Sequence, residues 1–467
     1  MLLLELVLKG LQMLYRRTAP DSSHNSGHRY PPPKCHPGTR LGTLTDIMKW
    51  VDDRSQACSV FWLKGPAGAG KSAIAQTIAE QCTESGQLAS SFFFAKGDPM
   101  RGNANRLFTT IAYRLAHSIP QLKMAIDAVV TNDEFILDAS LGVQLQRLIA
   151  EPFLMATSAE PLPEAALIII DGLDECEDSR TQQHILSLIS TACTTYQVPV
   201  HFLIASRPEP QISESFGEDH LLSITWPYVL DESPLDMTKY FVDEFDNIYK
   251  RHHRAMAHVP TPWPSHKTIE YLVTKASGQF IYAATVLKFV DHEQYRPTDR
   301  LDIVLGLTPS NVYPFSELDA LYEKILSVYH DIPLLRIILA FILDMNDSGL
   351  ALAFHISFNG CSSSSIEATL LLKPGDVNLA LYGCHSVVVV PDSTYDEIRI
   401  PHASLVDFLR NKTRSKKFFI ERGTGVTKVM RADLKAITQL ASRFTNRGCY
   451  KYVIHTARWA INNFSTI

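Results

Sequence analysis

The sequence lacks long apolar runs, paired cysteines and a large excess of charge of either sign. Charge or proline interrupts every apolar run within about a dozen residues, whereas a membrane span needs about 20. The eight cysteines include no CxxC pair, which disfavours a zinc site or a disulfide framework and indicates reduced, mostly buried thiols. The net charge of -5 supplies no general attraction for nucleic acid. We therefore expect a cytoplasmic protein with no membrane span and no nucleic-acid partner.

The composition is that of an ordinary globular protein. The 467 residues are 46% hydrophobic and 20% charged, which excludes a mostly disordered or collagenous chain. This length suggests roughly three domains at about 150 residues each. No internal repeat is evident, which argues against a solenoid or propeller.

The first 40 residues are predicted to be a short helix and a linker. The apolar run Met1–Leu8 has no positive charge before it and no prompt cleavage site after it, so we interpret it as an amphipathic helix and not as a signal peptide. Residues Thr18–His36 are rich in Ser, His and Pro and include three consecutive prolines. Such a composition predicts a mobile linker with polyproline character.

Residues 41–228 are predicted to be one α/β domain. Short apolar runs alternate with helical periods there, and continuous apolar runs are expected of strands that helices cover on both faces. The predicted strands are Ser59–Leu63, Ser90–Ala95, Leu167–Ile170, Val200–Ala205 and Leu221–Trp226. Two of the helical periods are Ser72–Cys82 and Gln182–Cys193.

The rest of the chain is mainly helical in its pattern. Residues 229–300 are predicted to be a helical subdomain, with helical stretches at Pro234–Lys250 and His266–Val290. Residues 301–420 are predicted to be a winged-helix region, because helices are followed by a β-hairpin. Its predicted parts are the helices Ser316–Tyr329 and Pro333–Met345, a Ser-rich turn at Cys361–Ser365, and strands at Ser386–Val390 and Glu397–Ile400. Residues 421–467 are predicted to be a helical segment.

A full GxxxxGK[ST] motif lies directly after the first predicted strand and opens a helix. In this setting backbone N–H groups curl around phosphates, and the helix N-terminus adds positive potential. Lys71 is placed to reach the β- and γ-phosphates, and the Ser72 hydroxyl to bind Mg²⁺. The predicted nucleotide-binding residues are Gly65, Pro66, Ala67, Gly68, Ala69, Gly70, Lys71, Ser72 and Ala73.

Acidic residues follow the third predicted strand. Asp171 ends an apolar run, where a carboxylate can hold Mg²⁺ beside the phosphates, so Ser72 and Asp171 are the predicted metal ligands. Asp174 and Glu175 are candidates to polarise an attacking water, although acids also favour a helix N-terminus for other reasons.

Arg207 follows the next strand and would point into the crevice where open α/β sheets bind ligands. A surface arginine that opens a loop is the alternative. Lys71, Asp174, Glu175 and Arg207 are therefore the candidate catalytic residues.

The segments GPAGAGKS, LIIIDGLDEC and FLIASRPEP together resemble a NACHT domain, in the STAND class of signal-transduction NTPases. The chain is similar in particular to the large NACHT family of fungi, over about residues 35 to 420. Further segments that resemble this family are Cys35–Arg40, Ser277–Ala283, Leu301–Leu305, Leu318–Tyr322, Pro374–Val377 and His402–Leu409. The fold that the resemblance implies is an α/β P-loop NTPase with a five-stranded parallel sheet (ASCE/STAND type), followed by a helical subdomain and a winged helix.

The resemblance also implies a function. A NACHT protein is an ATP/ADP switch with slow Mg²⁺-dependent hydrolysis, nucleotide-controlled self-association and a further protein partner, here unidentified, and fungal members act in non-self recognition or cell death. It assigns His402 to the ADP β-phosphate of the closed form, and Thr39 and Arg40 to the base or ribose. One departure is that Gly278-Gln279-Phe280 lacks the proline that packs on adenine in related proteins.

Two alternatives stay open. No Asn-Lys-x-Asp guanine motif occurs, which favours ATP, but some NACHT proteins are thought to use GTP. The chain is alternatively a truncated or degenerate scaffold that binds nucleotide without significant hydrolysis.

Overall fold

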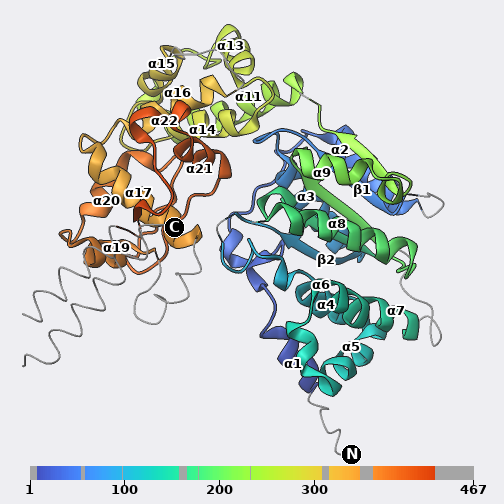
Figure 1. Ribbon diagram of the computed structural model, residues 1–467. Coiled ribbons are helices and arrows are strands. Elements are labelled where there is room, and N and C mark those ends of the chain that lie inside the picture. The colour runs from blue at the N-terminus through green and yellow to red at the C-terminus, as the bar shows by residue number, and fades with distance from the viewer. Residues whose placement is uncertain are drawn as a thin grey trace, which may run out of the picture. The chain divides into compact units, whose positions relative to one another are not determined.

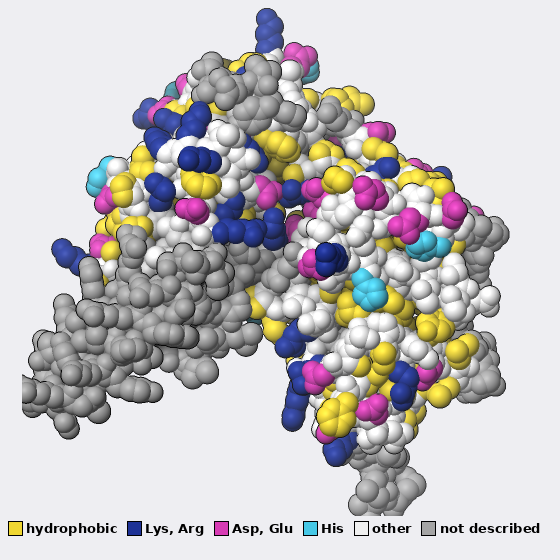
Figure 2. Space-filling model, in the orientation of Figure 1, with side chains coloured by type: hydrophobic (Ala, Val, Ile, Leu, Met, Phe, Trp, Pro, Cys, Tyr) yellow, Lys and Arg dark blue, Asp and Glu magenta, His cyan; other side chains and the backbone are white. Residues whose placement is uncertain are grey.

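The computed structural model describes residues 8–53, 58–96, 98–156, 166–176, 178–231, 233–307, 315–347, 361–425 and 427. The chain divides into two compact units (Figure 1). The first comprises residues 1–287 and 291–297, and the second comprises residues 288–290 and 298–467. Among the described residues, no helix combines the length and apolarity that crossing a membrane requires. Figure 2 shows basic, acidic and hydrophobic side chains interspersed over the visible face.

A five-stranded parallel sheet forms the centre of the first unit, as predicted. Its strands are β1 (Val60–Lys64), β2 (Leu88–Phe93), β3 (Leu167–Asp171), β4 (His201–Ser206) and β5 (Thr225–Val229). Their order is β2-β3-β4-β1-β5, and every neighbouring pair is parallel. An additional strand, β4, therefore lies between the strand that leads into the GxxxxGKS loop and the strand that ends at Asp171.

The fifth predicted strand, Leu221–Trp226, is wrong in its first half. Leu221 and Leu222 end the short helix α10 (Asp219–Leu222), and the strand begins only at Thr225. The physical reason is that β5 lies at the edge of the sheet, so its side chains alternate between buried and exposed and it tolerates Pro227. A search for continuous apolar runs finds central strands and misplaces an edge strand of this kind.

Helices cover both faces of the sheet (Figure 1). Between the sheet and these helices lie two separate layers of buried apolar side chains. One layer joins the odd-numbered residues of β1 to α2 (Leu41–Asp52) and α3 (Lys71–Glu84). The other joins the even-numbered residues of β1 to α4 (Leu107–Ser118), α8 (Ser179–Thr194) and α9 (Pro210–Gly217). This alternation explains why the central strands are apolar throughout.

The predicted linker is packed against the first unit instead. Helix α1 spans Lys9–Tyr15, and Leu11 N donates to Asp127 Oδ1 at 2.9 Å; the predicted helix Met1–Leu8 lies almost wholly outside the described residues. Two 3-10 turns follow, η1 (Pro20–Ser22) and η2 (Gly27–Arg29), so these parts of the segment are not polyproline helix; no helix or strand includes Pro31–Pro33, where polyproline character stays a prediction. Side chains of residues 18–36 form hydrogen bonds with the α/β domain, for example His24 with Ser91 and Arg29 with Gln76. Amino-acid composition alone does not reveal such long-range contacts.

Several shorter helices lie between strands β2 and β4 in the chain. They are η3 (Ala104–Arg106), α5 (Pro120–Asn132), η4 (Glu134–Asp138), α6 (Leu141–Leu145), the π-helical turn η5 (Gln146–Ala150), α7 (Glu151–Ala156) and η6 (Leu173–Glu175). The helical stretches after β5 are α11 (Pro234–Arg251), α12 (His253–Met256), α13 (His266–Ala276) and α14 (Phe280–Val290). The single predicted stretch His266–Val290 is thus two helices, because Ser277 and Gly278 both adopt positive φ between them.

The second unit is helical around two buried ion pairs. Its helices are α15 (Pro297–Leu305), α16 (Ser316–Leu326), α17 (Ile332–Asp347), α19 (Ser363–Leu370), α20 (Asp376–Leu381), η7 (Tyr382–Cys384), α21 (Ala403–Arg410), α22 (Lys412–Ser415) and η8 (Lys416–Phe418). Arg410 Nη2 lies 2.6 Å from Asp344 Oδ1, and Arg414 Nη2 lies 2.8 Å from Asp319 Oδ1. Both carboxylates are almost fully buried.

Two local predictions for the second unit change. The Ser-rich segment Cys361–Ser365 begins helix α19, because the Ser362 side chain accepts a hydrogen bond from Ser365 N at 3.2 Å and caps the helix. The predicted hairpin is one antiparallel bridge between Val389 and Arg399, with reciprocal backbone hydrogen bonds of 2.8 and 3.0 Å. Residues 428–467, predicted to be helical, lie outside the described residues.

Candidate nucleotide-binding site

The GxxxxGKS loop runs from the end of β1 to the start of α3. Gly70 caps the helix with a φ of 96°, and Gly68 has a φ of 75°. Only glycine adopts such angles without strain, so the two glycines give the loop its turn. The first N–H groups of α3 face the loop without helical partners, which is the arrangement that binds phosphate at helix N-termini.

The Lys71 ammonium lies over its own loop. Its Nζ donates hydrogen bonds to the carbonyl oxygens of Gly65 at 2.8 Å and Pro66 at 2.9 Å. Burial lowers the pKa of Lys71, while the carboxylates of Asp174 and Asp171 raise it. Within the described residues its hydrogen bonds go to neutral carbonyl oxygens, which it can exchange for the charged oxygens of a phosphate.

Asp171 and Ser72 form a pair suited to a hard metal ion. Asp171 ends β3, it is only 4% exposed, and the neighbouring Ser72 hydroxyl acts to lower its pKa. Its buried Oδ1 atom has no hydrogen-bond partner among the described residues. Burial raises the pKa of Asp171 to about 6. A spare carboxylate oxygen beside a hydroxyl fits Mg²⁺, which takes oxygen ligands.

No group of three His, Cys, Asp or Glu side chains in the described part of the chain could hold a metal ion. Mg²⁺ does not require one, since it is commonly bound through one or two carboxylates together with substrate phosphates.

Asp174 and Arg207 are brought together by the ends of β3 and β4. Asp174 Oδ1 accepts a hydrogen bond from Arg207 N at 2.9 Å, and its Oδ2 lies 3.1 Å from Arg207 Nε. Asp174 is therefore arranged to position Arg207. Glu175 Oε2 accepts from Lys96 N at 3.2 Å, and burial, followed by the charge of Asp174, raises the pKa of Glu175 to about 7. A pKa near neutrality suits a general base.

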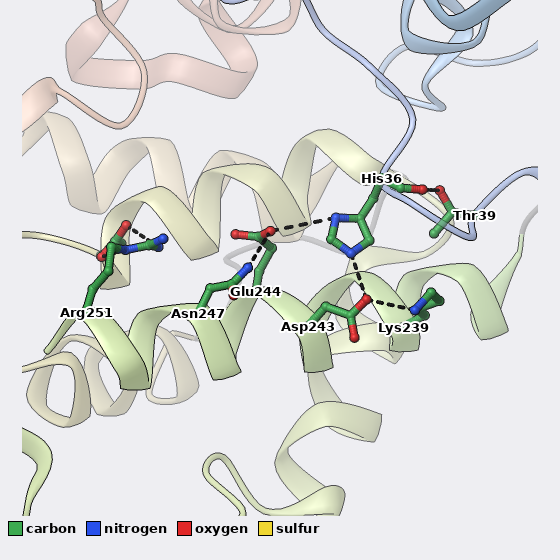
Figure 3. A network of polar contacts seen from close by, with 8 residues as sticks. His36, Thr39, Lys239, Asp243, Glu244, Asn247 and Arg251 are labelled. Atoms are coloured by element: carbon green, nitrogen blue, oxygen red, sulfur yellow. Dashed lines mark hydrogen bonds and ion pairs between the residues drawn. The ribbon is translucent and has the colours of Figure 1, made fainter. Parts of the chain in front are cut away.

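Arg40 contacts the loop, whereas Thr39 bonds within its own turn. Arg40 Nη2 donates to Ala69 O at 3.0 Å and Nη1 to Asp231 O at 2.7 Å, and the guanidinium lies 4.9 Å from the Phe280 ring centre. Thr39 Oγ1 donates to His36 O at 2.7 Å (Figure 3).

Helix α14 also lies on the loop. Ile281 N donates to Gly68 O at 3.2 Å, and the Ile281 side chain fills the space that a Cβ atom on Gly68 would need. Sequence reasoning did not identify this contact. The signal for it in the sequence is the segment Ser277–Ala283, which resembles part of the helical subdomain of NACHT proteins.

His36 joins the N-terminal segment to helix α11 (Figure 3). Its Nε2 lies 2.8 Å from Asp243 Oδ2 and its Nδ1 lies 3.7 Å from Glu244 Oε1. Lys239 Nζ donates to the same Asp243 oxygen at 2.8 Å. The N-terminal segment is therefore tied to the helices that follow the sheet.

His402 belongs to the second unit, where it precedes helix α21. Burial, followed by the charge of Lys288, lowers the pKa of His402 to about 4, so the imidazole is neutral at physiological pH. Its contact with a nucleotide stays a prediction.

The segment that contains this site is similar to a known protein family. Residues 39–207 match the family model described as Nephrocystin 3, N-terminal, a stretch that includes the glycine-rich loop, Asp171 and Arg207. No curated protein matches the chain.

Solved structures of low identity also match. One is the Aeropyrum pernix ORC1 protein in complex with DNA, at 14% identity and a TM-score of 0.32, covering 85% of this chain and 94% of that chain. Another is Drosophila ORC bound to poly(dA/dT) DNA and Cdc6, at 13% identity and a TM-score of 0.27, covering 100% of this chain and 71% of that chain. The parallel sheet, together with the glycine-rich loop between β1 and α3, shows that the first unit has an α/β P-loop NTPase fold.

Proposed function

We propose that this chain is a NACHT-type switch that binds ATP and ADP with Mg²⁺ and hydrolyses ATP slowly. The observation that carries the proposal is the buried Asp171 carboxylate near the Ser72 hydroxyl at the start of α3, with one oxygen that has no partner in the described part of the chain. A buried unsatisfied carboxylate oxygen is costly, and a metal ion at this place would compensate it.

The residues of the site have separable tasks in this proposal. The loop from Gly65 to Ala73 binds the phosphates, and Lys71 exchanges its carbonyl partners for their oxygens. Ser72 and Asp171 would hold Mg²⁺, which neutralises charge on the phosphates. Glu175 orients the attacking water and accepts its proton, while Asp174 holds Arg207 toward the terminal phosphate.

The contacts of the loop support a switch. Gly68 touches Ile281 of α14, and Arg40 joins Ala69 to Asp231 after β5. If nucleotide exchange changes the conformation of the loop, these contacts would transmit the change directly to α14 and to the segment after β5. We propose that self-association follows from this change, that His402 of a winged helix contacts ADP in the closed form, and that the output is fungal non-self recognition or cell death.

Nucleotide content tests the proposal. The purified protein is denatured and any released nucleotide is identified by chromatography, where stoichiometric ADP or ATP is expected. Guanine nucleotide would establish the GTP-using alternative. Excess Mg-ATP at about 100 times its Kd should stabilise the protein by roughly 2.7 kcal/mol.

Lys71→Ala should abolish both the retained nucleotide and the stabilisation. Lys250→Ala is the matched control, because that lysine lies on helix α11, is 69% exposed and forms an ion pair with the exposed Asp246. Full ATP affinity in Lys71→Ala would contradict the proposed site.

A scaffold that binds nucleotide with little hydrolysis is the second candidate. Both carboxylate oxygens of Asp174 contact Arg207, so Asp174 is not free to activate a water molecule. Of the two candidate bases, Asp174 and Glu175, only Glu175 is left for this task, which favours slow hydrolysis or none. Release of inorganic phosphate from bound ATP decides between the two functions, and Glu175→Gln should stop it if the chain is an NTPase.

A further inference from the structure

Arg29 brings a positive charge to the acidic end of the nucleotide site. Its Cζ lies 3.6 Å from the centre of the Phe93 ring, and Phe93 is the residue of β2 that pairs in register with Asp171. Its Nη1 donates to Gln76 Oε1 at 2.8 Å. Gln76 lies one turn after Ser72 on α3 and therefore on the same helix face. Arg29 thus contacts a direct neighbour of each proposed magnesium ligand.

The surrounding segment holds Arg29 in this position. Backbone N and side-chain Nδ1 of His24 both lie 3.1 Å from Ser91 Oγ of β2, and Gln76 Nε2 donates to His24 O at 3.0 Å. On the other side of Arg29, Cys35 N donates to Thr77 Oγ1 of α3 at 3.1 Å. The segment is fastened to β2 and α3 both before and after the arginine.

The charge of Arg29 acts on Asp171. Within the described residues, no carboxylate forms an ion pair with Arg29. Burial lowers the pKa of Arg29 to about 10, while Asp171 raises it, so the guanidinium stays charged at neutral pH. The positive charge of Arg29, like that of Lys71, acts to lower the pKa of Asp171.

We infer that Arg29 is a positioning residue of the nucleotide site, whose charge offsets the Asp171 carboxylate so that phosphates can approach the loop. The inference rests on the proposed nucleotide binding. An uncompensated carboxylate at this place repels a polyphosphate. Mg²⁺, when bound, supplies the same compensation, so the contribution of Arg29 is largest when the metal is absent.

The test is the affinity for ATP measured by calorimetry, once in EDTA and once in Mg²⁺. Arg29→Gln keeps a hydrogen-bonding side chain and removes the charge. It should weaken ATP binding in EDTA by about tenfold, equivalent to roughly 1.4 kcal/mol, and change binding in Mg²⁺ much less. Arg17→Gln is the matched control, since Arg17 lies in the same N-terminal segment and pairs with the exposed Asp138; it should change neither affinity.

A double-mutant cycle separates the charge from a structural role. In an Asp171→Asn background, Arg29→Gln should no longer weaken binding in EDTA, because the charge that it offsets is gone. Arg29→Lys, which keeps the charge, should retain most of the affinity even where Arg29→Gln folds poorly.

Four results would overturn the inference. Equal losses in EDTA and Mg²⁺, or a loss that persists in the Asp171→Asn background, would assign Arg29 to packing alone. Unchanged binding by Arg29→Gln would remove it from the site while the proposed function stands. If the wild-type chain binds no ATP in either condition, the proposed function fails and the inference fails with it.

Discussion

The contact between Gly68 and helix α14 makes Gly68→Ala a strong test of the structure. A Cβ atom at Gly68 would overlap the Ile281 side chain, and the φ of 75° is itself strained for alanine. The conformational strain costs roughly 1–2 kcal/mol, and forced overpacking roughly 1–3 kcal/mol. We expect Gly68→Ala to lower the free energy of unfolding of the first unit by about 3 kcal/mol.

A second glycine separates the two contributions. Gly86 has nearly the same φ, 74°, but a Cβ atom there meets nothing within 4 Å. Gly86→Ala therefore carries only the strain, about 1–2 kcal/mol. Ile281→Ala removes the obstructing methyl group but keeps the Cβ atom, 3.1 Å from a Cβ at Gly68, so Gly68→Ala should cost clearly less in that background than in the wild type, near the upper end of the roughly 1–2 kcal/mol expected at Gly86.

Tryptophan fluorescence during urea unfolding is the assay. Four of the five tryptophans belong to the first unit, so the signal reports mainly on it: Trp50, Trp62, Trp226 and Trp263. If Gly68→Ala is no more destabilising than Gly86→Ala, or if Ile281→Ala gives no relief, α14 does not lie against the loop and the reasoning is refuted.

Three further predictions concern charge. The raised pKa of Glu175, about 7 against an ordinary value of 4.5, means that the folded state holds the proton more tightly, so stability should fall as pH rises across that window; Glu175→Gln should reduce this slope in urea titrations at a series of pH values. Arg40→Ala should lower the free energy of unfolding, measured by urea titration, by about 3 kcal/mol, because two charge-assisted hydrogen bonds are lost; Arg40→Lys should restore little of this stability, since an ammonium group cannot reach both carbonyl oxygens as the guanidinium does. Arg410→Ala should destabilise the second unit by about 3–5 kcal/mol, because the buried Asp344 carboxylate loses the charge that balances it; the change is detected as faster limited proteolysis, with partial recovery in Asp344→Leu/Arg410→Met.

The central part of the site could be predicted because its signals are local. The loop motif, Asp171 and Arg207 each stand directly beside a strand that is apolar throughout, and β1, β3 and β4 lie within a residue of their predicted positions. The edge strand β5 lacks that pattern, since only one of its sides is paired and its side chains alternate in burial.

Arg29 and Ile281 could not be predicted, because their positions depend on pairings between distant segments. Arg29 reaches Gln76 of α3, and His24 reaches Ser91 of β2, from a segment whose composition resembles a solvated linker. Neither the Ser- and Pro-rich composition nor any periodicity of that segment indicates which surface it covers. The contact of Ile281 with Gly68 likewise requires the chain to return to the loop after the whole sheet has formed.

The place of β1 in the sheet has a consequence for synthesis on the ribosome. Its two neighbours are β4 and β5, and Val60 pairs with Phe202 on one side and Thr225 on the other. A nascent chain that has emerged only to the end of β3 carries the complete GxxxxGKS motif on a strand with no partner on either edge. The nucleotide site therefore matures late, because the strand that leads into the loop gains its first partner only when β4 has left the ribosome tunnel, and an unpaired apolar strand of this kind is prone to aggregate until then.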